Sequence, residues 1–335
     1  APMCAWPSAV GIYGPDTMCS ASLVHPEIIV TAGHCLQSAA ITTMFVGDDA
    51  YAPALEVPIS SCTRHPNYEL EYPDYADFMF CRLAGPLEGV PIVPILMGCE
   101  ADELVPGAPA VLAGYGLADD ALPEGRKRMV TTAIDYLEDT RVFFVGGTGK
   151  GTCDGDSGGP AYVKLSDGTW RVIGTTTGGA TCGDWGQSEL IHELVPWLEE
   201  TSGIDVTPCH DADGTWAPTD ACGAFPLDPD APTNQDWGSL CAFGPTTPPS
   251  ATCGPAFGDM PDVDDTTSTS DGGSSDEGSA DDGPGLDPDV DPNLPFDDDP
   301  EPAQPSHGCA IDRSTPSALL VFALLLRRRR ARSTR

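Results

Sequence analysis

The stretch Gly155-Asp156-Ser157-Gly158-Gly159-Pro160 places a serine among small, turn-forming residues. A serine hydroxyl is a weak nucleophile until a base takes its proton, and that base needs an acid to fix its tautomer. The glycines leave backbone N–H groups open to an attacked carbonyl, although a tight Gly-Asp turn between strands is the simpler alternative. The six residues together favour Ser157 as a nucleophile, with the N–H groups of Gly155 and Ser157 as oxyanion donors.

A candidate base lies in the upstream run Thr31-Ala32-Gly33-His34-Cys35. A neutral imidazole accepts a serine proton and later donates it to a leaving amine. Taken alone, a histidine before a cysteine is more often structural. Because the serine stretch occurs in the same chain, we interpret His34 as the catalytic base.

These two motifs resemble those of the chymotrypsin/trypsin family of serine endopeptidases, and the resemblance extends from about Ala5 to about Gly203. It implies an all-β fold class with two six-stranded antiparallel β-barrels and a C-terminal helix. The amphipathic run 188–200, which precedes Gly203, predicts that helix. We expect a protein or peptide as substrate, no cofactor, and a monomer.

The acid that orients His34 has two candidates. In this family the orienting aspartate is followed at once by an alternating apolar strand. Asp77 is followed by Phe78-Met79-Phe80 and fits that form, whereas Asp74 does not. We therefore predict that Asp77 accepts the second ring N–H of His34. Asp74 is the alternative, and its simpler interpretation is a loop residue.

The chain has thirteen cysteines, which favours an oxidising compartment, secreted or extracellular. The resemblance implies that one bridge joins the cysteines around the candidate base and that another closes the specificity pocket. Two further pairs are reasonable, although spacing alone does not fix connectivity. The expected disulfides are Cys19–Cys35, Cys153–Cys182, Cys62–Cys81 and Cys4–Cys99.

The resemblance places the primary specificity pocket between the segments 148–153 and 175–179. Gly151 stands where trypsins carry an aspartate, so a substrate Arg or Lys lacks a buried partner on this wall. The substrate-binding residues that we expect are Gly151, Thr152, Thr177, Gly178, Gly179 and Gly186.

The opposite wall of this pocket differs from the Ser-Trp-Gly of most relatives. Thr177 keeps a hydroxyl that would help to hold Asp77, and Gly178 removes the usual aromatic shelf. We expect an open pocket for a medium or large apolar side chain. Asp184 would add a negative charge if its loop folds inward.

Charge is distributed unevenly along the chain, whose formal net charge is -35. Lys and Arg are absent from Val172 to Asp312, and Asp accumulates between Asp259 and Glu301. Such a chain repels phosphate groups, so a nucleic-acid partner is excluded. The acidity belongs mainly to a tail.

The composition changes after Ile204, and four regions follow. The segment after Ile204 contains Cys209, Cys222, Cys241 and Cys253, which predict a small module with two disulfides of its own. The run 210–214 is similar to a calcium loop but lacks the later Glu, so calcium is only an alternative to no metal. The expected regions are a protease domain over 1–204, the disulfide module over 205–257, a disordered acidic linker over 258–307 and a sorting signal over 308–335.

The last region combines Cys309, the short apolar run 318–326 and four arginines, 327–330. The apolar run is too short for an ordinary spanning helix, which needs about 20 residues. The arrangement resembles the sorting tail of myxobacterial surface proteins, in which the cysteine region is processed. It implies attachment to a bacterial cell surface or outer membrane, with membrane contact only through this tail.

The amino-terminal region departs from the family pattern. No secretion signal is visible at Ala1, so we expect a chain that is already trimmed. Active relatives begin with a freed Ile-Val-Gly-Gly-type terminus that pairs with the acid before the nucleophile, here Asp156, and the stretch before Cys19 looks short. Either the mature terminus lies elsewhere or Asp156 is satisfied differently.

Two other functions compete with proteolysis. A catalytically inactive surface-binding protein with a protease fold would explain the missing terminus and Gly178. A lipase or esterase would carry its serine in a GxSxG elbow, with the histidine after the serine. Here His34 precedes Ser157, and the complete Ser/His/Asp set favours the endopeptidase.

Overall fold

The structure, a computed structural model, describes residues 1–254 except 16, 37–39, 70–75, 119–123, 139–140, 180 and 249–252. The chain divides into two units, Ala1–Asp265 and Thr266–Arg335. The predictions for 258–307, for 308–335 and for Cys309 therefore lie outside the described residues. Within the described residues, no helix is long and apolar enough to cross a membrane.

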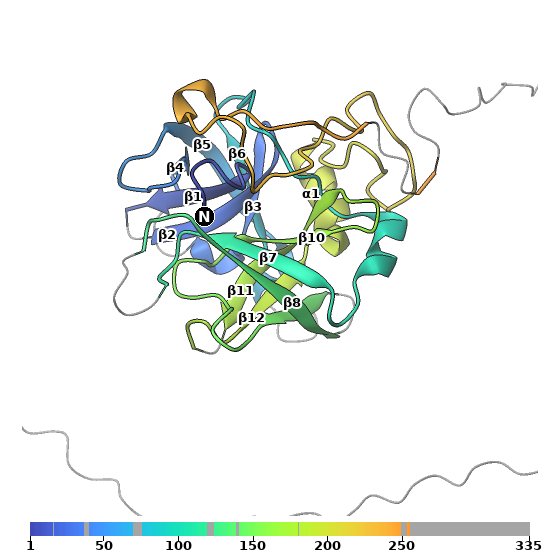
Figure 1. The fold of residues 1–335 in the computed structure, drawn as a ribbon, viewed down its shortest axis with the longest axis horizontal. Helices are drawn as coiled ribbons and strands as arrows, with labels where there is room; N and C mark the ends of the chain where they lie inside the picture. The colour runs from blue at the N-terminus through green and yellow to red at the C-terminus, as the bar shows by residue number, and fades with distance from the viewer. Residues whose placement is uncertain are drawn as a thin grey trace, which may run out of the picture. The chain divides into compact units, whose positions relative to one another are not determined.

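Six antiparallel strands close the first barrel in the order β1-β2-β3-β6-β5-β4 (Figure 1). Its interior is filled by aliphatic and Met side chains that are almost fully buried. Such residues occupy the inward-facing positions of the strands, as the period of two requires. The strands are β1 (Ala9–Gly14), β2 (Thr17–His25), β3 (Ile28–Thr31), β4 (Thr43–Val46), β5 (Leu55–Arg64) and β6 (Met79–Leu83).

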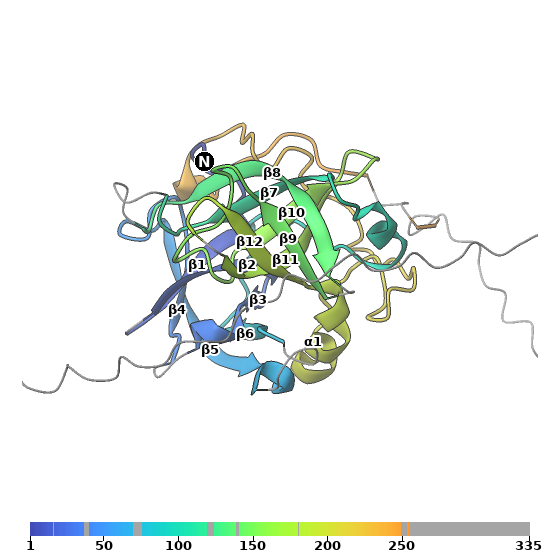
Figure 2. The same ribbon diagram turned by 90° about the horizontal axis from the view of Figure 1, so that it is seen from below.

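A second closed barrel follows in the order β10-β11-β12-β9-β8-β7, again with antiparallel neighbours. The predicted fold class, two six-stranded antiparallel barrels with one C-terminal helix, is confirmed. Figure 2 shows both barrels from below. The strands are β7 (Pro109–Gly114), β8 (Arg128–Glu138), β9 (Val142–Gly146), β10 (Pro160–Lys164), β11 (Trp170–Gly179) and β12 (Trp185–Leu190).

The C-terminal helix is shorter than its predicted range. Helix α1 spans Val195–Ser202 and ends at Gly203, whose φ of 68° is left-handed and suits glycine. The residues 188–190, predicted as helix, belong to strand β12 because they pair with both β11 and β9. The short 3-10 helices are η1 (Gly33–Cys35), η2 (Pro66–Glu69), η3 (Gly98–Glu103), η4 (His192–Leu194) and η5 (Trp237–Ser239).

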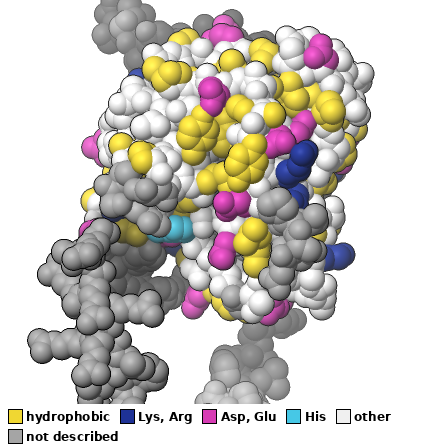
Figure 3. All heavy atoms as spheres, turned by 90° about the vertical axis from the view of Figure 1, so that its left-hand side faces the viewer, with side chains coloured by type: hydrophobic (Ala, Val, Ile, Leu, Met, Phe, Trp, Pro, Cys, Tyr) yellow, Lys and Arg dark blue, Asp and Glu magenta, His cyan; other side chains and the backbone are white. Residues whose placement is uncertain are grey.

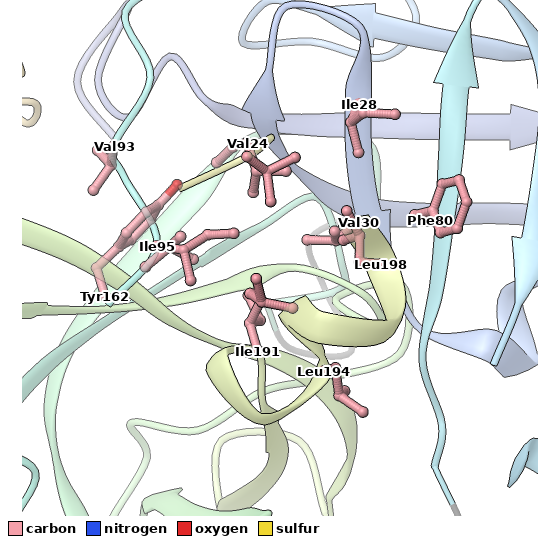
Figure 4. Packing of buried hydrophobic residues seen from close by; sticks show 14 of the residues in the cluster. Val24, Ile28, Val30, Phe80, Val93, Ile95, Tyr162, Ile191, Leu194 and Leu198 are labelled. Carbon is pink, nitrogen blue, oxygen red and sulfur yellow. The ribbon is translucent and has the colours of Figure 1, made fainter. Parts of the chain in front are cut away.

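A shared hydrophobic cluster lies between the barrels (Figure 4). Val30 and Phe80 enter it from the first barrel, and Tyr162 and Leu198 enter it from the second half of the chain. Trp6 is fully buried in the same cluster and stacks on Tyr162 at 4.4 Å between ring centroids. Close packing of this kind fixes the two barrels against each other, so residues from both are held at constant separation.

Six disulfides join described cysteines, and one expected pair is wrong. Cys4 is bonded to Cys241 and Cys99 to Cys253, so Cys4 and Cys99 do not pair with each other. Asp48 helps to hold Cys4 close to the segment that carries Cys241, because its carboxylate accepts both the backbone N–H of Cys4 and the indole N–H of Trp237. The other pairs are Cys19–Cys35, Cys62–Cys81, Cys153–Cys182 and Cys209–Cys222.

The segment after Ile204 is therefore not a module with two disulfides of its own. Of its bridges, Cys209–Cys222 is internal, whereas Cys241 and Cys253 tie it to the barrels. Figure 1 shows this segment, in yellow to orange, running past the first barrel near the amino terminus.

The disulfides indicate an extracellular protein. On the face in Figure 3, acidic side chains are scattered among hydrophobic ones.

Candidate active site

His34 lies in helix η1, directly after strand β3. Its backbone N–H donates to Asp77 Oδ1 at 2.8 Å, and its ring Nδ1 lies 2.6 Å from Asp77 Oδ2. The neighbouring Gly33 has no room for a side chain, because a Cβ there would lie 2.8 Å from the Tyr68 ring and 3.2 Å from Asp77 Oδ1. The backbone turn therefore holds His34 close to Asp77.

Asp77 precedes strand β6 and is 4% exposed, whereas the His34 side chain is 31% exposed. A buried carboxylate on Nδ1 selects the tautomer that carries its hydrogen there. The lone pair of Nε2 is then left as an acceptor. The competing acid, Asp74, lies outside the described residues.

The turn that carries Ser157 docks on the first barrel. The backbone N–H of Ser20 in β2 donates to the Ser157 carbonyl at 2.8 Å, and Cys35 Sγ lies 3.8 Å from that oxygen. Gly158 has a φ of 80°, and a Cβ there would lie 1.9 Å from Thr31 Oγ1. The structure thus brings the Ser157 backbone beside the residue that follows His34.

The sulfurs of Cys19 and Cys35 and a His34 ring nitrogen lie within 4.8 Å of one another. This is the one such group of three metal-ligating residue types among the described residues. The two sulfurs are joined in a disulfide, so they offer no thiolate to a metal. The bridge instead fixes the backbone on both sides of the imidazole.

The Asp156 side chain stabilises the turn that carries Ser157. Its two carboxylate oxygens accept the backbone N–H groups of Gly116 and Cys153, each at 2.9 Å. Burial raises the pKa of Asp156 to about 6, and the two N–H donors and Arg128 oppose that rise. These bonds hold Gly155, with φ of 90°, in the conformation that only glycine adopts readily.

A cavity of about 160 Å³ lies beside Asp156 and is lined by the apolar side chains of Leu117, Met129 and Val130 among others. The carboxylate therefore has main-chain partners and adjacent space. The same cavity also borders Gly151, Thr152 and Gly183 of the expected pocket region.

The expected pocket residues lie on two strands and one loop of the second barrel. Thr177, Gly178 and Gly179 end strand β11, and Gly186 lies opposite in β12. The hydroxyl of Thr177 donates to the Gln187 carbonyl at 3.4 Å. The expectation that it holds Asp77 is therefore wrong.

Gly151 and Asp184 meet at the base of this region. A Cβ on Gly151 would lie 1.4 Å from the Asp184 carbonyl oxygen, so no side chain fits at position 151. The Asp184 residue is exposed, and its backbone rather than its carboxylate faces Gly151. An inward acid at this position, one of the sequence alternatives, is not present.

Glu189 is a further residue near the acid, and sequence reasoning missed it. It is 3% exposed, and its Oε1 lies 3.6 Å from Arg141 Nη2, while Oε2 has no hydrogen-bond partner within the described part of the chain. Burial raises the pKa of Glu189 to about 8, opposed by Arg141. The last three residues of its strand β12, 188–190, are all buried. The sequence there therefore lacks the alternation of polar and apolar residues that would have predicted a strand.

The run similar to a calcium loop is folded as a turn. His210 is buried, with its ring 5.0 Å from that of Trp216 in an edge-to-face arrangement. The Asp213 carboxylate accepts the backbone N–H of Thr215 at 2.9 Å. These local contacts therefore give a structural reason for the residues found in the run 210–214.

Comparison with known proteins identifies the class to which this fold and site belong. The family model described as Trypsin matches residues 1–197, which is more than half of the 335 residues. The chain belongs to the trypsin family.

Three relatives show the extent of the similarity. Ovochymase of Halocynthia roretzi is 26% identical over 227 residues, which are 60% of this chain and 14% of ovochymase. Chymotrypsin-like elastase family member 3B of Macaca mulatta is 27% identical over 209 residues, 55% of this chain and 81% of the elastase. Vitamin K-dependent protein C of Rattus norvegicus is 26% identical over 217 residues, 55% of this chain and 46% of protein C. The chain thus spans less than half of ovochymase and of protein C.

Proposed function

We propose that this protein is a serine endopeptidase that hydrolyses peptide bonds through an acyl-enzyme. The observation that carries the proposal is the 2.6 Å contact between His34 Nδ1 and Asp77 Oδ2, beside the turn that contains Ser157. A buried acid on Nδ1 leaves Nε2 as the general base that a serine nucleophile needs. Membership of the trypsin family supports the same activity.

In the proposed mechanism, His34 Nε2 takes the proton of Ser157 as Oγ attacks the substrate carbonyl. The electron pair of the C=O bond moves to oxygen, and the N–H groups of Gly155 and Ser157 stabilise that oxyanion. The imidazolium then protonates the leaving nitrogen, and the C–N bond breaks to give an acyl-enzyme. Water then attacks the ester as His34 Nε2 takes its proton, the C–O bond to Ser157 breaks, and the imidazolium returns the proton to Ser157 Oγ as the carboxylic acid product leaves. Asp77 stabilises the imidazolium in both steps.

We further propose that the enzyme works outside the cell and is displayed on a bacterial surface. The support is the sequence of the last region, where Cys309 precedes the apolar run 318–326 and the arginines 327–330. The acidic segment 258–307 would separate the protease from that surface, because like charges extend a chain. Fractionation of cells that produce Cys309→Ser tests this, since the variant should leave the surface fraction. Equal surface display of variant and wild type would contradict it.

Binding without catalysis is the second candidate function. One observation favours it: Gly178 leaves open space where relatives carry an aromatic shelf, since no atom of the described residues lies within 4 Å of a Cβ built there. A missing shelf weakens the hold on a substrate backbone. It leaves the His34–Asp77 pair intact, so we rank binding below proteolysis.

Hydrolysis of a denatured protein substrate tests the proposed function. Wild type should cleave it, whereas Ser157→Ala and His34→Ala should each lose at least about 10³-fold in rate. Ser166→Ala is the matched control, because Ser166 lies exposed on the surface and binds Glu103. Full activity of Ser157→Ala, or inactivity of a folded wild type, would overturn the proposal.

A further inference from the structure

The side chain of Thr152 reaches across the region between the two pocket walls. It is 6% exposed, and its Oγ1 lies 3.4 Å from the carbonyl oxygen of Gly178 on the opposite wall. A hydroxyl that contacts the far wall occupies the space in which a substrate side chain would otherwise lie. Thr152 therefore limits the depth of the pocket.

Glycines surround Thr152 where larger residues would collide with it. A Cβ on Gly186 would lie 2.6 Å from Thr152 Oγ1 and 3.1 Å from its Cγ2, and a Cβ on Gly179 would lie 3.2 Å from Oγ1. Real Cβ atoms do not approach as closely as 2.6 Å without a shift of the neighbour. The space that these glycines leave is thus already filled by Thr152.

Backbone contacts join the segments below Thr152, and the cavity of about 160 Å³ beside Asp156 also borders Gly151, Thr152 and Gly183. The Asp184 carbonyl oxygen lies where a side chain of Gly151 would begin, and the Gly183 N–H donates to the Thr152 carbonyl at 3.2 Å. The Cys153–Cys182 disulfide ties the two segments together. Bonded backbone of this kind yields less readily than a flexible side chain.

The mouth of the region is different. At Gly178 none of the residues that the structure describes lies within 4 Å of a built Cβ, so the entrance is open on this side. The expectation of an open pocket for a medium or large side chain rested on this glycine and is supported only at the mouth. Deeper in, Thr152 contradicts it.

We infer that Thr152 closes the specificity pocket below its mouth and restricts the residue before the scissile bond to a small uncharged side chain, such as Ala, Ser or Val. The inference rests on the proposed function. A bulky ring would have to displace the Thr152 side chain from its contact with the Gly178 carbonyl. A substrate Arg or Lys would find no inward carboxylate, because Gly151 has no side chain and Asp184 is exposed.

The test uses the full-length protein and a set of peptide anilides that differ only in the residue before the cut: Ala, Val, Leu, Phe or Arg. For wild type, kcat/KM should be higher with Ala and Val than with Phe or Arg by at least about 100-fold, since misfit in a packed pocket costs this much. Thr152→Gly should raise kcat/KM for Leu and Phe at least about tenfold relative to Ala, and Thr152→Ser should lie between. Thr131→Ala, an exposed position on β8, is the matched control and should keep the wild-type order.

Comparable rates with Phe and Ala in wild type, or an unchanged order in Thr152→Gly, would overturn the inference. A second measurement separates it from the proposed function: peptides that end in Ala or in Phe are titrated into Ser157→Ala, and the Thr152 methyl signal is followed by NMR. Selective binding of the Ala peptide by Ser157→Ala, together with a folded wild type that hydrolyses nothing, would support the pocket inference and overturn the proposed enzymatic function. Equal or no binding of both peptides would sink the pocket inference itself.

Discussion

His34 and Asp77 are joined by two hydrogen bonds, one from the backbone N–H to Oδ1 at 2.8 Å and one between the ring Nδ1 and Oδ2 at 2.6 Å. The two contacts use both oxygens of a single buried carboxylate. The main-chain bond sets the position of the residue, and the ring bond sets its tautomer. Loss of the charge should therefore damage chemistry more than structure.

Asp77→Asn should lower kcat by about 10⁴-fold, because the amide favours the wrong imidazole tautomer. Circular dichroism and the melting temperature should stay close to wild type, since Asn keeps an acceptor for the His34 backbone. Asp74→Asn is the control, because Asp74 was the competing candidate. Equal loss of activity in Asp74→Asn, or near-normal activity in Asp77→Asn, would show that the acid was assigned wrongly.

Glu189 should make stability depend on pH. Its pKa is raised from 4.5 to about 8 in the folded state, so the neutral acid is favoured there. The stability it contributes is fully present below about pH 4.5 and is lost as the pH rises through about 8. The side chain of Glu189→Gln cannot ionise. The unfolding free energy of the variant should therefore increase relative to that of wild type between pH 5 and 9, by an amount on the order of a few kcal/mol.

Urea unfolding at several pH values measures this difference, and Glu200→Gln, an exposed residue of α1, is the control. Subtraction of the two curves removes the share of Asp156, whose pKa is also raised. A pH-independent difference between Glu189→Gln and wild type would mean that Glu189 is ionised in the folded protein.

The ion pair between Arg171 and Glu100 should matter for stability. Both side chains are at most 2% exposed, and the guanidinium donates to both carboxylate oxygens, at 2.6 and 2.9 Å. Arg171→Met should cost about 3–5 kcal/mol in unfolding free energy, because it leaves a buried carboxylate unpaired. The double variant Arg171→Met/Glu100→Gln should recover part of this loss. An Arg171→Met protein as stable as wild type would show that the ion pair does not stabilise the fold.

The bridge from Cys4 to Cys241 should appear directly in a non-reducing peptide map. Cys4→Ser/Cys241→Ser should lower the unfolding free energy by about 2–4 kcal/mol while the other bridges stay in place. Peptides joined through Cys4 and Cys99 would contradict the structure and restore the pair that the sequence made reasonable.

The barrels could be predicted well from the sequence because short motifs and strand alternation are local features of the chain. The runs 18–24 and 28–32, joined by the His25-Pro26 turn, have the composition of strands, and they coincide with β2 and β3 almost to the residue. The helix start was wrong, since Ser188 and Glu189 have helical spacing but are held in a sheet by their neighbours in β9 and β11. Tertiary pairing here overrides a local pattern.

Two other features depend on contacts far apart in the chain. The partner of Cys4 lies 237 residues away, and nothing in the local sequence marks it. The inferred depth of the pocket rests on the contact between Thr152 Oγ1 and the Gly178 carbonyl, which the glycine at position 178 does not predict from the sequence. Such contacts follow from the fold and not from spacing.

Labelling with a fluorophosphonate tests the central claim most directly, because the probe reacts with an activated serine. Wild type should take up one probe, mapped to Ser157 by mass spectrometry, and Ser157→Ala should take up none. His34→Ala should label more slowly by at least about 10³-fold, since the base is gone. Labelling at another serine, or none in a folded wild type, would contradict the proposed nucleophile and favour a protein that only binds.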